Sequence, residues 1–199
     1  MGQITDVVKH LIIINVIVFL AVNFTPLSDY SKTLALYYPG DTRFQPFQIV
    51  SHMFMHGGLN HLIMNMLGLF FLGPTVERFV GSKNFFILYF ACGLGAVVLR
   101  SLVQYTGFIP DHIPAVGASG AVVGVVTAFA TIFPHQKLYL MFIPVPVKAM
   151  YMMTGLVVFD LYCGFTGTMP GVAHFAHLGG AVVGFLMAWF WFKKYNFRR

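Results

Sequence analysis

The chain has 199 residues, of which 58% are hydrophobic and 9% are charged, and its mean hydropathy is +0.78. Soluble domains carry about 25% charged residues, so the composition excludes a typical soluble protein. The formal net charge of +6 does not indicate nucleic-acid binding, because the basic residues form no basic face or arm and lie in the connections between apolar blocks. The sequence therefore predicts an integral membrane protein.

The apolar residues come in blocks of about 17–25 residues, the length of a helix that crosses a bilayer. Six candidate spans follow in chain order: 7–24, 57–76, 85–103, 116–133, 147–165 and 172–192. The first block runs into a polar loop without a signal-peptide cleavage site, so we interpret it as a retained helix. Cys92 and Cys163 lie inside apolar blocks and form no disulfide framework or metal motif. We expect an all-α membrane protein, a bundle of six transmembrane helices in one domain over residues 1–199 that lies in a lipid bilayer.

The basic residues predict the orientation of the bundle. Six spans place both termini on one side, and the side richer in Lys and Arg faces the cytoplasm. With cytoplasmic termini, nine of the 12 basic residues are inside, and the three outside are Lys32, Arg43 and Arg100. We therefore expect a multi-pass protein of the cell inner membrane or plasma membrane with both termini in the cytoplasm.

Polar residues are rare inside the predicted spans, and they gather at one depth. His61 and Asn65 lie near the start of the second span, Ser119 near the start of the fourth, and His177 near the start of the sixth. These three spans begin on the outer side, so each group lies roughly 5–12 Å below the outer end of its helix. Ionisable groups inside a membrane mark functional sites, and the topology alone predicts a site here.

The residue types in this site suit acyl transfer. A serine hydroxyl becomes a nucleophile when a base removes its proton, and histidine is the usual base. Ser119 at a helix start also lies at the positive end of the helix dipole, which favours a developing oxyanion. His61 and Asn65 are four residues apart on one helical face and can both donate hydrogen bonds to it. Ser119 and His177 are therefore the candidate catalytic residues.

Small residues explain how the histidine reaches the serine. Gly180 and Gly184 in the sixth span, and Gly120 and Gly124 in the fourth, have the spacing that lets membrane helices pack closely. Gly117 leaves room for the chain to turn into the fourth helix and for a substrate backbone to approach. No acidic residue follows the pattern of a third triad member, so the expectation is a Ser–His dyad.

Three motifs resemble the rhomboid family of intramembrane serine proteases. The stretch 52–65 has the family's histidine four residues before an asparagine, 117–120 reads G-x-S-G, and 176–184 reads A-H-x-x-G-x-x-x-G. Glu77 followed by Gly81 is similar to the family's E-x-x-x-G. The motifs occur in family order over about residues 45–184, and six helices without an extra one resemble the minimal bacterial form.

The resemblance implies a role for each part. Ser119 would be the nucleophile and His177 the general base, with His61, Asn65 and the Ser119 amide forming the oxyanion hole. The long loop 25–48 would correspond to the family's membrane-embedded first loop, and the fifth helix with the loop after it to its lateral gate and cap. The implied partners are single-pass transmembrane proteins, cleaved near the outer end of their helix at small residues. No cofactor and no metal are expected.

The sequence departs from the family pattern at two places. Val123 stands where the family usually has an aromatic ring that stacks on the catalytic histidine, and Phe47–Gln48 stands near the family's usual Trp-Arg pair. Neither change removes a reacting group. Because some rhomboid relatives are inactive, a catalytically weak binder of membrane helices remains an alternative.

A metal-dependent membrane enzyme is the other alternative, suggested by five histidines at or near the spans. No H-E-x-x-H motif is present, and the one acid within a span is Asp160. For the histidines before the second span we favour hydrogen bonds that position the loop. The five histidines are His52, His56, His61, His174 and His177.

Overall fold

The structure is a computed structural model that describes residues 3–110, 112–140, 143–169 and 171–196. Its long helices lie within a few residues of the predicted spans. Their bounds are α1 Asp6–Phe24, α4 Leu59–Val80, α5 Ser82–Tyr105, α6 Ser119–Ile132, α7 Ala149–Thr166 and α8 His174–Asn196. Five are long and apolar enough to cross a membrane, and α6 is shorter, with 14 residues. The prediction of an all-α membrane bundle is confirmed.

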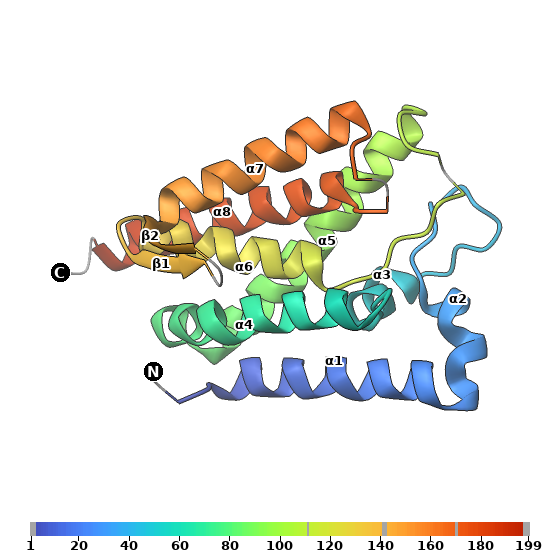
Figure 1. The fold of residues 1–199 in the computed structure, drawn as a ribbon, viewed down its shortest axis with the longest axis horizontal. Helices are drawn as coiled ribbons and strands as arrows, with labels where there is room; N and C mark the ends of the chain where they lie inside the picture. The colour runs from blue at the N-terminus through green and yellow to red at the C-terminus, as the bar shows by residue number, and fades with distance from the viewer. Residues whose placement is uncertain (1–2, 111, 141–142, 170, 197–199) are drawn as a thin grey trace.

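Helices α6 and α8 form the centre of the bundle. They pack against each other and against α5, while α4 covers α6 on another side. Helices α1 and α7 lie at opposite edges, and the N- and C-terminal ends of the chain lie at the same end of the bundle (Figure 1). At about 1.5 Å per residue, α6 is only about 21 Å long. At the end that carries α2 and α3, it stops short of the neighbouring helices α4 and α5 (Figure 1).

A seam of glycines brings α6 and α8 into backbone contact. A Cβ added at Gly124 would lie 2.8 Å from the carbonyl oxygen of Gly180, and Cβ atoms added at Gly180 and Gly184 would meet the carbonyls of Gly120 and Gly124. Any side chain here would push the helices apart. The prediction that these two small-residue faces meet is confirmed.

The carboxylate of Glu77 ties the bundle together at the end that holds the termini. It accepts hydrogen bonds from the backbone amides of Val7 at 3.2 Å and Val8 at 3.0 Å, and from the hydroxyls of Thr5 and Ser82. These amides belong to the first turn of α1, where backbone N–H groups have no acceptor within their own helix. Glu77, which is 2% exposed, therefore caps α1 from a neighbouring helix.

Two connections contain structure that the sequence did not predict. Between α6 and α7 the chain forms an antiparallel hairpin, β1 Lys137–Leu140 and β2 Ile143–Lys148, with Lys137 opposite Lys148. Proline in β2 argues against a central strand, but both strands of a two-stranded sheet have a free edge that tolerates it. The hairpin lies at the same end as the termini (Figure 1).

The long loop between α1 and α4 folds at the opposite end. It contains η1 Pro26–Tyr30, α2 Ser31–Leu34, α3 Gln48–Ser51 and η2 His52–Phe54.

Gln48 holds this loop together. Its amide nitrogen donates to the carbonyls of Thr33 and Arg43, both at 3.0 Å, and its oxygen accepts from the backbone amides of Gln45 at 3.1 Å and Tyr37 at 3.3 Å. Every polar atom of this buried side chain is used, so the loop is an ordered layer over the bundle.

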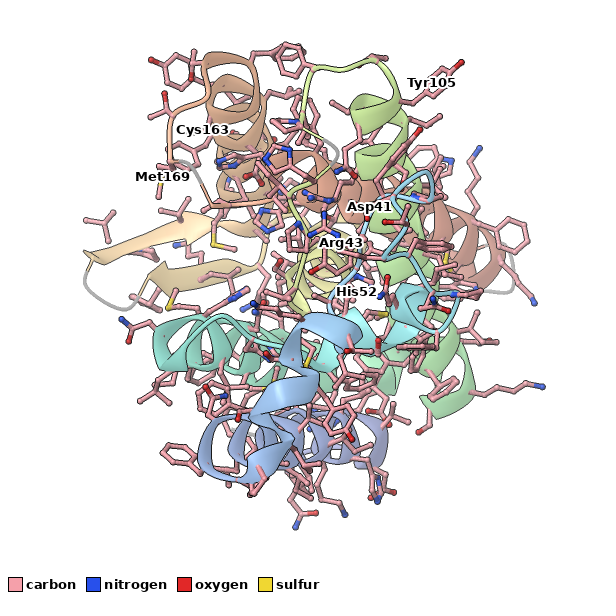
Figure 2. All side chains as sticks on the ribbon, turned by 90° about the vertical axis from the view of Figure 1, so that its right-hand side faces the viewer. Asp41, Arg43, His52, Tyr105, Cys163 and Met169 are labelled. Atoms are coloured by element: carbon pink, nitrogen blue, oxygen red, sulfur yellow. The ribbon has the colours of Figure 1, made fainter. Side chains whose placement is uncertain are left out.

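Beside Gln48, an ion pair fixes the surface of the loop. The guanidinium of Arg43 donates to Asp41 at 2.6 Å and stacks over the ring of Tyr37. The hydrogen bond from Arg43 lowers the pKa of Asp41 to about 2. In the end-on view both residues lie near the centre of the molecule with His52, whereas Cys163 and Met169 lie at the α7 side (Figure 2).

Candidate active site

Ser119 is the first residue of α6, at the end of the bundle that carries the long loop. The segment before it is extended and pinned on both sides: Leu36 and Ala115 exchange backbone hydrogen bonds, and the amide of Gly117 donates to the carbonyl of His52 at 2.9 Å. Gly117 has φ +125°, a conformation that other residues rarely adopt. The Ser119 backbone amide follows this turn and belongs to the first turn of α6, whose amides have no acceptor inside the helix.

His177 lies in the first turn of α8 and contacts the serine directly. Its Nε2 is 2.9 Å from Ser119 Oγ, within hydrogen-bond distance. The glycine seam begins one residue after Ser119 in α6 and three residues after His177 in α8, and the backbone contact there fixes how closely the first turns of the two helices approach. The two residues predicted as nucleophile and base are therefore brought together by the fold.

An acid lies behind the histidine, which corrects one expectation from the sequence. Both carboxylate oxygens of Asp160, in α7, are 3.2 Å from His177 Nδ1, and Oδ1 is also 2.7 Å from His174 Nδ1. The sequence pattern indicated no acid beside the histidine, and the structure places one there; that Ser119 and His177 act as a dyad stays a prediction. No motif spacing links Asp160 to Ser119 or His177 in the sequence. It lies six residues before the end of α7, which places it about 9 Å below that end of the helix. Its depth relative to Ser119 could have identified it.

The two candidate oxyanion donors occupy the first turns of α4. A Cβ added at Gly117 would lie 2.8 Å from His61 Nε2 and 3.6 Å from Ser119 Oγ, so the imidazole lies beside the nucleophile's turn. The amide nitrogen of Asn65 donates to the carbonyl of His61 at 3.0 Å and retains a second hydrogen. Asn65 is buried, so that hydrogen is held inside the bundle.

The histidines before α4 are buried and belong to the loop. His52 Nδ1 lies 2.8 Å from the carbonyl of Gln48, and the His56 ring packs edge-on against His61 with 5.2 Å between centroids. Burial lowers the pKa of each of these two side chains, His52 and His56, to about 4. Both are neutral near pH 7. The contact of His52 agrees with the predicted hydrogen-bonding role, whereas the prediction is wrong for His56, whose two ring nitrogens are buried without a hydrogen-bond partner.

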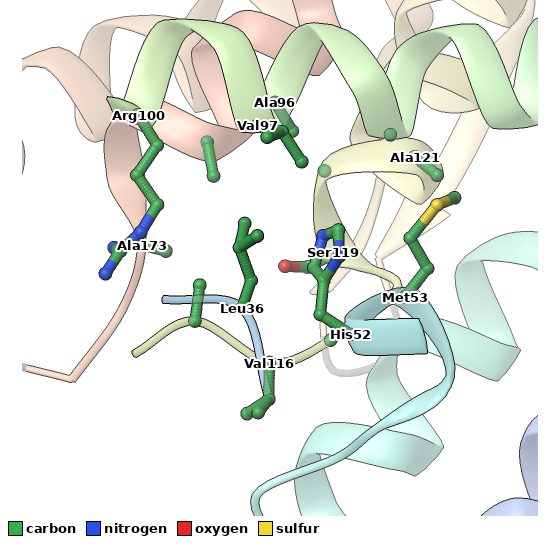
Figure 3. A pocket seen from close by; sticks show the side chains of 15 residues that line it. Leu36, His52, Met53, Ala96, Val97, Arg100, Val116, Ser119, Ala121 and Ala173 are labelled. Atoms are coloured by element: carbon green, nitrogen blue, oxygen red, sulfur yellow. The ribbon is translucent and has the colours of Figure 1, made fainter. Parts of the chain in front are cut away.

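A small cavity adjoins the nucleophile. Ser119, His52, Met53, Leu36 and Arg100 line it, with the small residues of the neighbouring turns completing its wall (Figure 3). In the view of Figure 3, Arg100 lies apart from His52 and Ser119, across the residues that line the cavity. Space next to the nucleophile that is bounded by small residues suits a small side chain.

Within the described ranges, one group of three residues could hold a metal ion. Asp160, His174 and His177 each offer a ligand atom within 4.8 Å of the others. In the described part of the chain no such group includes His61 or the histidines before it, so the histidines do not converge on one metal site. His177 belongs to both arrangements: Nδ1 faces the carboxylate and Nε2 faces Ser119.

Val123 does not supply a ring to His177, the candidate base. It is partly buried and packs against the main core. The ring contact described for His177 comes from His174, edge-on with 6.3 Å between centroids. The ring beside His177 is therefore an imidazole from α8 itself, and not an aromatic side chain from α6.

Comparison with known proteins assigns the chain to a family. The family model described as the rhomboid domain matches residues 43–194, which include every candidate site residue. The chain belongs to the rhomboid family. The predicted family is confirmed, and the region outside the match comprises α1, most of the first loop and the C-terminal residues.

Several curated rhomboids are similar to this chain. RHOMBOID-like protein 4 of Arabidopsis thaliana is 35% identical over 71% of the chain and 33% of its own length, and the mitochondrial Rhomboid protein 1 of Saccharomyces cerevisiae is 32% identical over 71% and 41%. Rhomboid protease GluP of Bacillus subtilis is 27% identical over 71% of the chain and 25% of its own length. The aligned region thus spans less than half of each of these relatives.

Proposed function

We propose that this rhomboid is an intramembrane serine endopeptidase that cleaves single-pass transmembrane proteins near the outer end of their helix. The observation that carries the proposal is the 2.9 Å contact between His177 Nε2 and Ser119 Oγ at the recessed start of α6. A base within this distance can take the hydroxyl proton as the oxygen attacks a peptide carbonyl. The name of the Bacillus relative, a rhomboid protease, supports the same activity.

The residues divide the reaction between them. His177 removes the proton from Ser119, whose Oγ attacks the carbonyl carbon, and the carbonyl oxygen becomes an oxyanion. The Ser119 amide, His61 and Asn65 would donate to that oxyanion, and such donors are worth about 10²–10³-fold each in rate. His177 then gives the proton to the leaving amine. Water attacks the acyl-enzyme with the help of the same histidine, which restores Ser119.

The place of the site supports a substrate within the membrane. Helix α6 is short, so Ser119 lies below the bundle's end, and α7 is the most exposed of the long helices beside it, with 22% of its span buried against 50% for α8. A transmembrane segment that unwinds at its outer end could enter beside α7. The cavity next to Ser119 favours a small residue at the cleaved bond.

The direct test is cleavage of a model single-pass substrate by purified protein. Wild type is expected to cleave it, and Ser119→Ala and His177→Ala are expected to be inactive. The control Ser101→Ala, which replaces a serine of α5, is expected to cleave as wild type does. A fluorophosphonate should label wild type at Ser119 and leave Ser119→Ala unlabelled. Full cleavage by a clean Ser119→Ala sample would refute the proposal.

A metal-dependent activity makes the opposite prediction. The group of Asp160, His174 and His177 is the observation that favours testing it. Loss of cleavage in EDTA, recovery with added Zn²⁺ and indifference to fluorophosphonate would support that alternative. The serine mechanism predicts no effect of EDTA. A non-enzymatic binder would retain the substrate without cleaving it in wild type and Ser119→Ala alike.

We also propose that both termini are cytoplasmic and that the active-site end faces outward. Nine of the 12 basic residues support this orientation. Single cysteines at Tyr30 and Tyr139, both exposed and at opposite ends of the bundle, test it in a variant without Cys92 and Cys163. An impermeant maleimide added to whole cells should label only the cysteine at position 30.

A further inference from the structure

A buried carboxylate joins two histidines directly behind the nucleophile. Asp160 is 3% exposed and His174 is 6% exposed. Among the ion pairs of the described residues, Asp160 pairs with His174 and His177 and with no lysine or arginine. A buried carboxylate without a fixed cation depends on hydrogen-bond donors, and these two ring nitrogens are its donors.

The contacts select one tautomer of His177. A carboxylate only accepts hydrogen bonds, so the Nδ1 atom that faces Asp160 at 3.2 Å carries a proton. In the neutral ring, Nε2 then has the lone pair, and it faces Ser119 Oγ at 2.9 Å. This is the tautomer that a general base for Ser119 requires.

His174 is placed to hold the carboxylate and not the substrate. Its Nδ1 lies 2.7 Å from Asp160 Oδ1, closer than His177 Nδ1. Its other nitrogen, Nε2, is buried and without a hydrogen-bond partner. The side chain therefore gives its one polar contact to Asp160, and its ring lies edge-on to His177.

We propose that Asp160 is a positioning residue that fixes the orientation and tautomer of His177, with His174 holding the carboxylate in place. The inference rests on the proposed serine mechanism and extends it to four residues on three helices. Because Asp160 lies on α7 while Ser119 and His177 lie on α6 and α8, an outward displacement of α7 would remove the acid from the base. The position of α7 would then control whether His177 is held in the orientation and tautomer that a general base requires.

The test compares four variants by kcat, KM and the rate of fluorophosphonate labelling of Ser119. Asp160→Asn presents an amide that can donate to Nδ1 and favour the wrong tautomer, so kcat should fall by at least about tenfold and up to about 10⁴-fold, with KM within about twofold. Labelling, which needs no substrate entry, should slow in parallel. Asp160→Glu should recover part of kcat, and His174→Ala should lower kcat less than Asp160→Asn.

Cys163→Ala is the matched control. Cys163 is 1% exposed on α7, one turn from Asp160, and its substitution disturbs the same packing without touching the carboxylate. It should leave kcat unchanged. Wild-type kcat and labelling in Asp160→Asn would overturn the positioning role, while activity in Ser119→Ala would instead overturn the serine mechanism itself.

Two further measurements cover a variant that does not fold and a metal in the cluster. In the wild-type protein, ¹⁵N chemical shifts of the two histidines should report protonated Nδ1 and unprotonated Nε2; the reverse tautomer at His177 overturns the proposal. Purified protein should hold no stoichiometric Zn²⁺. Bound zinc that is lost in His174→Ala would make the cluster a metal site, because the metal would replace the hydrogen bond to His177 Nδ1.

Discussion

The glycine seam offers a sharp test of how the fold sets the catalytic distance. A Cβ at Gly180 would meet the carbonyl oxygen of Gly120 well inside 3.0 Å, below which real Cβ atoms are essentially never found. The obstacle is backbone, so it cannot rotate away. Gly180→Ala should force α6 and α8 apart by about 1 Å, at an overpacking cost of about 1–3 kcal/mol.

We expect that separation to lower the rate of cleavage more strongly than it lowers the stability of the fold. Ser119 and His177 lie within one turn of the seam, and their side chains are 2.9 Å apart, so an added separation of about 1 Å takes them out of hydrogen-bond distance. A misplacement of this size costs about 10²-fold in rate. We expect Gly180→Ala to remain folded in detergent with a lowered thermal midpoint and to lose about 10²-fold in kcat/KM.

Gly155→Ala is the matched control, because a Cβ there meets nothing within 4 Å. In a helix interior this exchange is favourable by about 0.5–1 kcal/mol, so its thermal midpoint should stay or rise and its activity should stay. Both quantities are measured on one preparation of each variant, with a model transmembrane substrate. If Gly180→Ala cleaves as fast as Gly155→Ala, the seam does not set the distance between base and nucleophile.

Four other predictions follow from single contacts. Asn65→Ala should lower kcat by about 10²–10³-fold without abolishing cleavage; an effect on KM alone would assign it to substrate binding. Phe165 on α7 packs edge-on against the rings of Phe108 and Phe175, so Phe165→Ala should loosen α7 and speed cleavage of a transmembrane substrate but not labelling by a small fluorophosphonate, and equal effects on both would argue against a gate. Glu77→Ala should lower the thermal midpoint more than Glu77→Gln, because it leaves buried amide donors unpaired; equal midpoints would contradict the capping role.

The fourth concerns acid stability. Burial holds the pKa of His52 and His56 near 4, below the unfolded value of 6.5, so the unfolded chain takes up protons first as the pH falls. Their contribution to stability is complete above pH 6.5 and is lost between about 6.5 and 4. The thermal midpoint should fall across this window and fall less in a His52→Gln, His56→Gln double variant; a flat wild-type profile would show that these histidines are not buried neutral.

The sequence by itself determined the spans and the depth of the site. Helix length in a bilayer is fixed by the thickness of the hydrocarbon layer, so apolar blocks alone gave six helices to within a few residues. The same rise per residue placed Ser119, His177 and His61 at one level. Spacing in the sequence also gave the glycine seam, since Gly120 with Gly124 and Gly180 with Gly184 repeat on one helical face.

Only the tertiary structure decided which side chains from different helices contact one another. Depth follows from counting along one helix, but the direction in which Asp160 points depends on how α7 packs against α8. That packing brings the carboxylate to His177 across 17 residues of chain with no periodic signal. The loop network around Gln48 and the hairpin 137–148 were likewise not predictable, because their hydrogen bonds join segments whose spacing obeys no helical or strand period. The depths of the candidate catalytic groups could therefore be predicted from the sequence. Their contacts could not, because they depend on how the helices are rotated against one another.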